Sequence, residues 1–245
     1  MPDTGQSDGL LDAIQKHLPI ALHGFDPRAR RTGLVIVDEV NGFATVGAGN
    51  LAPPAPNPQV SRMVSETGRL ARAFEERGWP MLAFLDTHVP GKPEPPYPPH
   101  CELGTGEENL VPELEWLEQA RHATLMRKDC INGFVGAIRP DGTNQVVDWV
   151  KSNRLEAVLV VGICTDICVM DFVLTMLSAR NHDLMPGLKD IVVYEGACST
   201  YDLPEGVAAD LGLPRTSAHP QMLTHHMGLY FMASRGAVLA GEVVL

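Results

Sequence analysis

Short, continuously apolar runs alternate along the chain with segments whose apolar residues follow helical spacing. The runs predicted as strands are residues 33–38, 80–86, 123–128, 157–162 and 190–197. The segments predicted as helices are residues 10–18, 59–78, 144–153, 217–234 and one that follows Thr165. Because strands buried on both faces are unbroken apolar runs, this order predicts a mainly parallel sheet with helices on both faces. We therefore expect an α/β fold, a three-layer αβα sandwich.

Two Pro/Gly-rich stretches, residues 47–58 and 89–109, interrupt the pattern. The second is long for a connection within a compact domain, and loops of that length are usually functional. Residues 1–30 carry one short amphipathic segment and a polar lead-in, so they are interpreted as peripheral. We expect residues 31–245 to form a single domain.

Composition and charge argue against several classes of function. The chain has 245 residues, with 30 acidic and 19 basic side chains and a formal net charge of -11. That charge disfavours nucleic acid as a partner, since neutralising phosphates needs clustered Lys and Arg. No apolar run is long enough for a membrane span, and no signal-peptide pattern begins the chain. Five cysteines without disulfide-framework spacing predict a reduced, cytoplasmic protein.

Chemically capable residues follow four of the predicted strands. In open α/β sheets, ligands bind outside the carboxyl ends of the strands. The residues placed there are Asp38, Asp86 with His88, Lys128, and Cys164 with Cys168. A single charged residue at a strand end is usually only solvated. An acid, an Asp-x-His pair, a lysine and a thiol at one edge together predict an active site.

The two cysteines of VVGICTDICVMD are predicted to differ in role. If Thr165 caps the following helix, Cys168 lies in its first turn, where free N–H groups and the helix dipole favour a thiolate nucleophile. Cys164 precedes the cap, and its N–H could form an oxyanion hole with that of Cys168. Asp38 could take the thiol proton and Lys128 could supply a cation. A C-x-x-x-C metal half-site and a redox pair are the alternatives. The other thiols are expected to be buried and inert: Cys101, Cys130 and Cys198.

A second group suits a divalent transition metal. Asp86 and His88 lie on the same side of an extended segment, and His100 follows across the proline-rich loop. A carboxylate and two imidazoles leave positions open for water or substrate. Glu94 could join through a water. The remaining histidines are interpreted as structural, His219 and His226 on one helix face, or as surface residues, His17, His23, His122 and His182.

With these residues identified, the chain resembles the isochorismatase-like cysteine hydrolases, and within them the plant-type nicotinamidases, from about residue 31 to residue 235. The motifs that carry the resemblance are VIVDEVNGF (35–43), DTH followed by YPPHCELGTGEENLVPEL (97–114), RKDCINGF (127–134) and VVGICTDICVMDF (160–172). The last matches the family's G-x-x-T-D-x-C-V signature. Two departures are Val40, where many members carry Gln, and the lack of a further His soon after the Asp-x-His pair.

The resemblance implies a role for each site residue. It implies a catalytic triad of Asp38, Lys128 and Cys168, and an oxyanion hole from the N–H groups of Cys164 and Cys168. It implies a cis peptide between Ile163 and Cys164. It assigns the metal to Asp86, His88 and His100, with zinc preferred and iron or manganese also suited. It places aromatic side chains around a pyridine ring: Phe43, Tyr97 and, with less support, Phe134.

The activity that the resemblance implies is hydrolysis of nicotinamide to nicotinate and ammonia through a cysteine thioester, in NAD salvage. The partner is then a small-molecule amide, and the protein is expected to be a homo-oligomer. One alternative is a related amidohydrolase acting on maleamate or an N-carbamoyl amide. The others are an isochorismatase, which lacks the nucleophilic cysteine, and a non-catalytic binding protein. The presence of Cys168 counts against the first, and the intact set of Asp38, Lys128 and Cys168 counts against the second.

Overall fold

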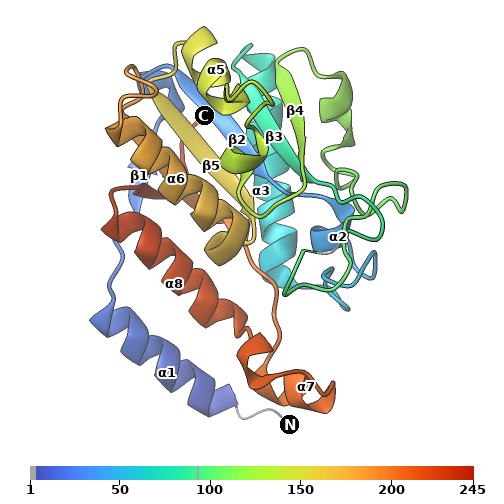
Figure 1. The fold of residues 1–245 in the computed structure, drawn as a ribbon. Coiled ribbons are helices and arrows are strands. Elements are labelled where there is room, and N and C mark those ends of the chain that lie inside the picture. Colours follow the sequence, from blue (N-terminus) through green and yellow to red (C-terminus); the bar gives the residue numbers. More distant parts are fainter. Residues whose placement is uncertain (1–3, 93) are drawn as a thin grey trace.

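In the described part of the chain, a central sheet of seven strands organises the fold (Figure 1). The computed structural model describes residues 4–92 and 94–245. The strand order is β1-β7-β6-β5-β2-β3-β4, and every neighbouring pair is parallel. The strands are β1 (His23–Phe25), β2 (Thr32–Val37), β3 (Met81–Asp86), β4 (Ala123–Lys128), β5 (Ala157–Ile163), β6 (Asp190–Ser199) and β7 (Val238–Val243). The predicted three-layer α/β fold is confirmed.

Helices cover both faces of the sheet. The α-helices are α1 (Thr4–His17), α2 (Asn41–Ala44), α3 (Pro58–Glu76), α4 (Gly133–Gly136), α5 (Gln145–Ser152), α6 (Met170–Asn181), α7 (Glu205–Asp210) and α8 (Gln221–Ser234). Short 3-10 turns are η1 (Pro27–Ala29), η2 (Glu115–Gln119) and η4 (Arg215–Ser217), and a π turn is η3 (Thr165–Val169). Helix α3 packs on one face, whereas α5, α6 and α8 pack on the other (Figure 1).

Strand β2 shows how the sequence pattern creates two cores. Val35 and Val37 belong to the hydrophobic cluster beneath α5 and α6. Leu34 and Ile36 belong to the cluster beneath α3. Because side chains alternate across a sheet, an unbroken run of β-branched and aliphatic residues supplies both layers at once.

Helix ends follow the expected local chemistry. The side chain of Asn57 accepts hydrogen bonds from the N–H groups of Gln59 and Val60, with Pro58 at the first helical position of α3. The helix ends at Glu76 with Arg77 as its C-cap, and Gly78 adopts a φ of 66°, which a glycine accommodates without strain. The helix predicted over residues 59–78 is therefore confirmed.

The two strands at one side of the sheet have no clear sequence signal. β1 has three residues, and β7 contains Gly241 and Glu242, so neither reads as an apolar run. β1 lies before residue 31, in the segment interpreted as peripheral, and pairs with β7. The division of the chain at residue 31 stays a prediction.

Two further properties bear on the sequence expectations. In the part of the chain that the structure describes, no helix combines the length and apolarity that crossing a membrane requires. All five cysteines are free thiols. Cys101 and Cys198 are buried as predicted, but Cys130 is only half-buried, because it lies in the loop after β4 and its thiol reaches the carbonyl of Asn132.

Candidate active site

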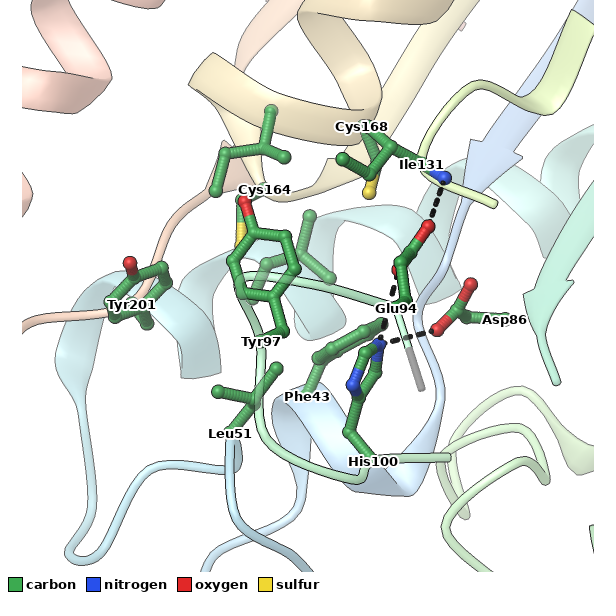
Figure 2. Close-up of a pocket in the computed structure, with 12 residues that line it drawn as sticks. Phe43, Leu51, Asp86, Glu94, Tyr97, His100, Ile131, Cys164, Cys168 and Tyr201 are labelled. Carbon is green, nitrogen blue, oxygen red and sulfur yellow. Dashed lines mark hydrogen bonds and ion pairs between the residues drawn. The ribbon is translucent and has the colours of Figure 1, made fainter. Parts of the chain in front are cut away.

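The carboxyl ends of four adjacent strands bring the predicted residues together. β5, β2, β3 and β4 are neighbours in the sheet, so the residues that end them meet at one edge. A cavity opens at this edge (Figure 2). Its lining residues are Phe43, Leu51, Asp86, Glu94, Tyr97, His100, Ile131, Ile163, Cys164, Ile167, Cys168 and Tyr201.

Lys128 lies between two carboxylates. Its Nζ is 2.8 Å from Oδ2 of Asp38 and 2.7 Å from Oδ1 of Asp86, and all three side chains are buried. Burial lowers the pKa of Lys128, but the carboxylates of Asp38 and Asp86, and Cys168 in its thiolate form, raise it well above its usual value. Burial also opposes ionisation of Asp86, yet the ammonium of Lys128 and hydrogen bonds from His100 and His88 lower its pKa. Lys128 is therefore charged and Asp86 ionised.

Asp38 is suited to be a base. Its φ of 54° places it in the left-handed region directly after β2, and its N–H donates to the carbonyl of Phe84 at 3.1 Å. Complete burial raises the pKa of Asp38 to about 6, against the attraction of Lys128. A carboxyl group with this pKa both accepts and returns a proton near neutral pH. Asp38, Lys128 and Cys168 are called the catalytic corner below.

The turn that carries Cys168 differs from the predicted one. Residues 165–169 form a single π-helical turn, in which the N–H of Val169 donates to the carbonyl of Cys164 at 3.1 Å. Such turns frequently occur at functional sites. Thr165 does not cap the helix; it is buried inside the turn, and its hydroxyl is 2.8 Å from Nδ1 of His225. The residue before the turn is Cys164, whose side chain makes no capping hydrogen bond.

Cys168 nevertheless lies in the first turn and lines the cavity. Burial raises the pKa of its thiol well above the usual value; Lys128 opposes this, whereas Asp38 adds to it. The thiolate expected from the helix end therefore stays a prediction, since burial opposes it and Lys128 favours it. The thiol has to lose its proton to a neighbouring base when it reacts.

The peptide bond between Ile163 and Cys164 is cis, as the family resemblance implies. Just before it, Gly162 has a φ of 125°, and a Cβ at this position would collide with the backbone oxygen of Val37. The backbones of β5 and β2 thus leave no room for a side chain at this position, next to the reactive turn. Only glycine fits there.

Asp86, His88 and His100 form a compact donor set in the described part of the chain, with one ligand atom of each within 4.8 Å of the others. Oδ2 of Asp86 is 3.0 Å from Nε2 of His88 and 3.2 Å from Nε2 of His100. Nδ1 of His100 is 2.8 Å from the carbonyl of Pro98, which fixes the ring and leaves Nε2 toward the cluster.

Glu94 adds a second carboxylate to this donor set, because its Oε2 is 3.6 Å from Nε2 of both histidines. Burial lowers the pKa of His100, but hydrogen bonds to Asp86 and Glu94 raise it to about 10. Two carboxylates crowded against two imidazoles place four donor groups close enough to share one cation. One carboxylate and two imidazoles, backed by Glu94, fit a divalent transition metal.

The predicted aromatic residues divide into two groups. Phe43 and Tyr97 line the cavity, with ring centroids 5.6 Å and 6.0 Å from that of His100. Phe134 is not among the lining residues of the described chain. Asn132 caps α4 and turns Phe134 into the core beneath α5 and α6. Its assignment to the pocket is corrected accordingly.

Sequence reasoning missed several apolar lining residues, most notably Tyr201. Tyr201 lies two positions past the end of β6, so the strand-end rule could have found it. Leu51 lies in the first Pro/Gly-rich stretch and carries no comparable signal.

The histidines near α8 have separate environments. Helix α8 begins at Gln221, so His219 precedes it and shares no helix face with His226. Nε2 of His219 is 2.8 Å from Oδ2 of Asp166. Nε2 of His226 is 2.9 Å from the carbonyl of Leu18. His17, His23 and His182 are exposed, whereas His122 is half-buried and lies 3.3 Å from Glu75.

The arrangement can be compared with known proteins. The Isochorismatase domain family matches residues 32–218. The chain belongs to the isochorismatase family. A curated relative, Nicotinamidase 1 of Arabidopsis thaliana, is 52% identical over 238 residues, which cover 96% of both chains. The family resemblance stated from the motifs is thereby confirmed.

Solved structures share the isochorismatase-family fold. The nicotinamidase PncA from Bacillus subtilis is similar with a TM-score of 0.62 at 22% identity, covering 86% of this chain and 99% of that one. The pyrazinamidase of Pyrococcus horikoshii, whose structure is a complex with zinc, has a TM-score of 0.59 at 20% identity and covers 86% of this chain and 98% of its own.

Proposed function

We propose that this isochorismatase-family protein is an amidohydrolase that converts nicotinamide to nicotinate and ammonia. The observation that carries the proposal is one apolar-walled cavity in which Cys168 and a metal-donor cluster meet, with Lys128 joining Asp38 to Asp86 behind it. The 52% identity to a curated nicotinamidase over nearly the whole chain supports the same substrate.

The first half of the reaction forms a thioester on Cys168. Asp38 accepts the proton of the Cys168 thiol, and the sulfur attacks the carboxamide carbon, so that a C–S bond forms and the carbonyl becomes an oxyanion. The N–H groups of Cys164 and Cys168 stabilise this oxyanion. Asp38, with a pKa of about 6, then returns the proton to the amide nitrogen. The C–N bond breaks, ammonia leaves and a thioester remains.

The second step releases the acid. Asp38, ionised again, takes a proton from a water that attacks the thioester carbon. The C–S bond breaks, nicotinic acid forms, and the departing sulfur of Cys168 recovers the proton from Asp38. The acid then loses a proton to solvent and leaves as nicotinate. Atoms balance over the cycle, since one water enters and one ammonia leaves.

Lys128 stabilises the negative charges that these steps require in a buried site. Its ammonium contacts Asp38 and Asp86 at 2.8 Å and 2.7 Å, so it compensates the carboxylates and attracts the thiolate as that forms. Two buried carboxylates without this cation would repel each other at high cost.

Asp86, His88 and His100 would hold a divalent transition metal, with Glu94 beside them. Bound there, the ion would supply a Lewis-acid contact that orients the substrate through its ring nitrogen. Zinc is our first choice because these ligands suit it, with iron and manganese next. Phe43 and Tyr97 supply flat apolar surfaces for the ring.

The test is ammonia release from nicotinamide by the wild type and two matched variants. Cys168→Ala removes the nucleophile and is expected to abolish turnover. Cys164→Ala removes a thiol but keeps the backbone N–H, so it should retain most activity. Full activity in Cys168→Ala would overturn the nucleophile. Turnover of maleamate or an N-carbamoyl amide without turnover of nicotinamide would overturn the substrate.

We further propose a cytoplasmic enzyme of NAD salvage that acts as a homo-oligomer. Nicotinate from this reaction would enter pyridine nucleotide synthesis, and five free thiols fit a reducing compartment. Light scattering of the purified protein tests the oligomeric state, and a fluorescent fusion tests the location.

A further inference from the structure

Tyr201 forms part of the cavity wall, yet it takes no part in the proposed chemistry. It follows β6 and lines the same cavity as Cys168. In Figure 2, Asp86, Glu94, His100 and Cys168 gather on one side, and Tyr201 lies on the other, beyond Tyr97. The part of the cavity lined by Tyr201 and Leu51 is called the far end below.

The ring of Tyr201 is held in place by His219. The two rings are stacked, with centroids 3.8 Å apart and an interplanar angle of 14°. Nδ1 of His219 is 2.9 Å from the backbone carbonyl of Tyr201, and Nε2 is 2.8 Å from Oδ2 of Asp166. Both neighbours are acceptors, so both ring nitrogens of His219 donate. His219 therefore supports the Tyr201 ring from behind and fixes its backbone.

Asp166 ties this support to the reactive turn. It lies in η3, two residues before Cys168, and is largely buried. Gly228 of α8 packs directly on it, where a Cβ would come within 2.8 Å of the Asp166 Cα. The hydroxyl of Thr224 approaches Nδ1 of His219 at 3.4 Å. The far end is therefore anchored to the same turn that carries the nucleophile.

We propose that Tyr201, positioned by His219 and Asp166, is a specificity-determining wall that limits the size of the substrate ring. The inference rests on the proposed function. A nicotinamide ring with its carboxamide at Cys168 and its nitrogen toward His100 directs carbon 5, which is meta to both groups, away from them. Tyr201 lies on the side of the cavity away from Cys168 and His100 (Figure 2), so we place carbon 5 toward the far end. In this orientation a substituent on carbon 5 extends past Tyr97 toward the Tyr201 ring at the far end.

The test compares kcat/KM for 5-phenylnicotinamide with kcat/KM for nicotinamide. Tyr201→Ala should raise this ratio by about tenfold or more, because a steric limit on ring size is removed. Tyr201→Phe keeps the stacked ring and should keep the wild-type ratio. His219→Ala should raise the ratio about threefold, since the ring loses its support. His219→Gln, which retains a donor toward Asp166, should restore part of the wild-type selectivity.

His226→Ala is the matched control. It also removes a buried, hydrogen-bonded histidine near α8, but its partner is Leu18 and it does not line the cavity. A merely structural effect would change both variants alike, whereas the wall predicts a changed ratio for His219→Ala alone. If Tyr201→Ala fails to fold by circular dichroism, Tyr201→Leu serves in its place.

An unchanged ratio in an active Tyr201→Ala or Tyr201→Leu variant would overturn the wall. Calorimetric binding of 5-phenylnicotinic acid relative to nicotinic acid provides a readout that needs no turnover. The affinity for 5-phenylnicotinic acid relative to nicotinic acid should be about tenfold higher in Tyr201→Ala than in the wild type. The same relative affinity in both proteins would also overturn the wall. Wild-type protein that binds nicotinic acid but releases no ammonia from nicotinamide would contradict the proposed function alone.

Discussion

The catalytic corner and the far end of the cavity are built differently. Asp38 follows β2, Lys128 ends β4 and Cys168 lies in the turn after β5, so the register of a parallel sheet brings them together. The far end is made by side chains on loops, Leu51 and Tyr201, and depends on contacts such as the stacking on His219. Sheet register fixes the chemistry, whereas loop contacts fix the shape of the space beside it. Changes at the corner should abolish turnover, and changes at the far end should alter selectivity.

The largest effect is expected for Lys128→Met. It leaves the buried carboxylates of Asp38 and Asp86 without their cation. Activity should fall by about a thousandfold, and the free energy of unfolding by about 3–5 kcal/mol. Ammonia release and urea denaturation measure the two effects. Lys189→Met is the control: this lysine is 66% exposed and pairs with Glu156 at the surface, so its loss should cost less than about 1 kcal/mol.

Gly162→Ala should destabilise the corner through the backbone. The added Cβ would collide with the backbone oxygen of Val37, at a φ of 125° that alanine tolerates poorly. We expect a loss of about 3 kcal/mol in thermal denaturation, together with most of the activity. Gly206→Ala in α7 meets open space, so it should be neutral or stabilise by up to about 1 kcal/mol. Equal stability of the two variants would contradict the close approach of β5 to β2.

The metal-donor cluster lies on the same side of the cavity as the catalytic corner. Loss of the metal should therefore affect turnover more than selectivity for ring size. Elemental analysis of the purified wild type should find about one divalent transition metal per chain, and His100→Ala should lose it. Chelation should lower kcat/KM for nicotinamide by about 10–100-fold, and zinc should restore it. His122→Ala, at a half-buried histidine outside the donor set, should keep its metal. A fully active, metal-free wild type would remove the proposed roles of Asp86, His88 and His100.

A smaller effect is expected at Glu39, next to Asp38 but pointing away from the chemistry. Glu39 is fully buried and accepts a hydrogen bond from Thr67 at 2.5 Å. Burial raises its pKa well above the usual value. The unfolded chain ionises near pH 4 while the folded chain keeps the proton, so stability falls as pH rises from that point.

Glu39→Gln removes this pH dependence. The variant should be more stable than the wild type at pH 7 by on the order of 1 kcal/mol, with little difference at pH 4. Urea denaturation at both pH values measures it. A variant that is less stable at pH 7 would mean that Glu39 is ionised in the folded protein.

The same contrast explains how much the sequence could predict. Apolar runs located five of the seven strands, and the strand-end rule then found Asp38, Asp86, Lys128 and Cys168, because a parallel sheet has one ligand-binding edge. β1 and β7 were missed because one is very short and the other mixes polar with apolar residues.

The pattern of hydrophobic and polar positions could not predict loop geometry or long-range contacts. The π turn and the unexpected bond from Thr165 to His225 depend on how α8 packs against η3. Phe134 satisfied a motif, but a cap at Asn132 directs its ring into the core. The stacking of Tyr201 on His219 joins residues 18 positions apart, and no periodicity signals it.

The central claim is that Cys168 is the nucleophile of an amide hydrolysis at the catalytic corner. Rapid acid quench during nicotinamide turnover, followed by peptide mass spectrometry, tests it most directly. The account predicts a nicotinoyl group on the sulfur of Cys168, formed and lost at rates consistent with turnover, and none on Cys164. Turnover with no acyl-enzyme on Cys168, or an acyl group on another residue, would contradict it.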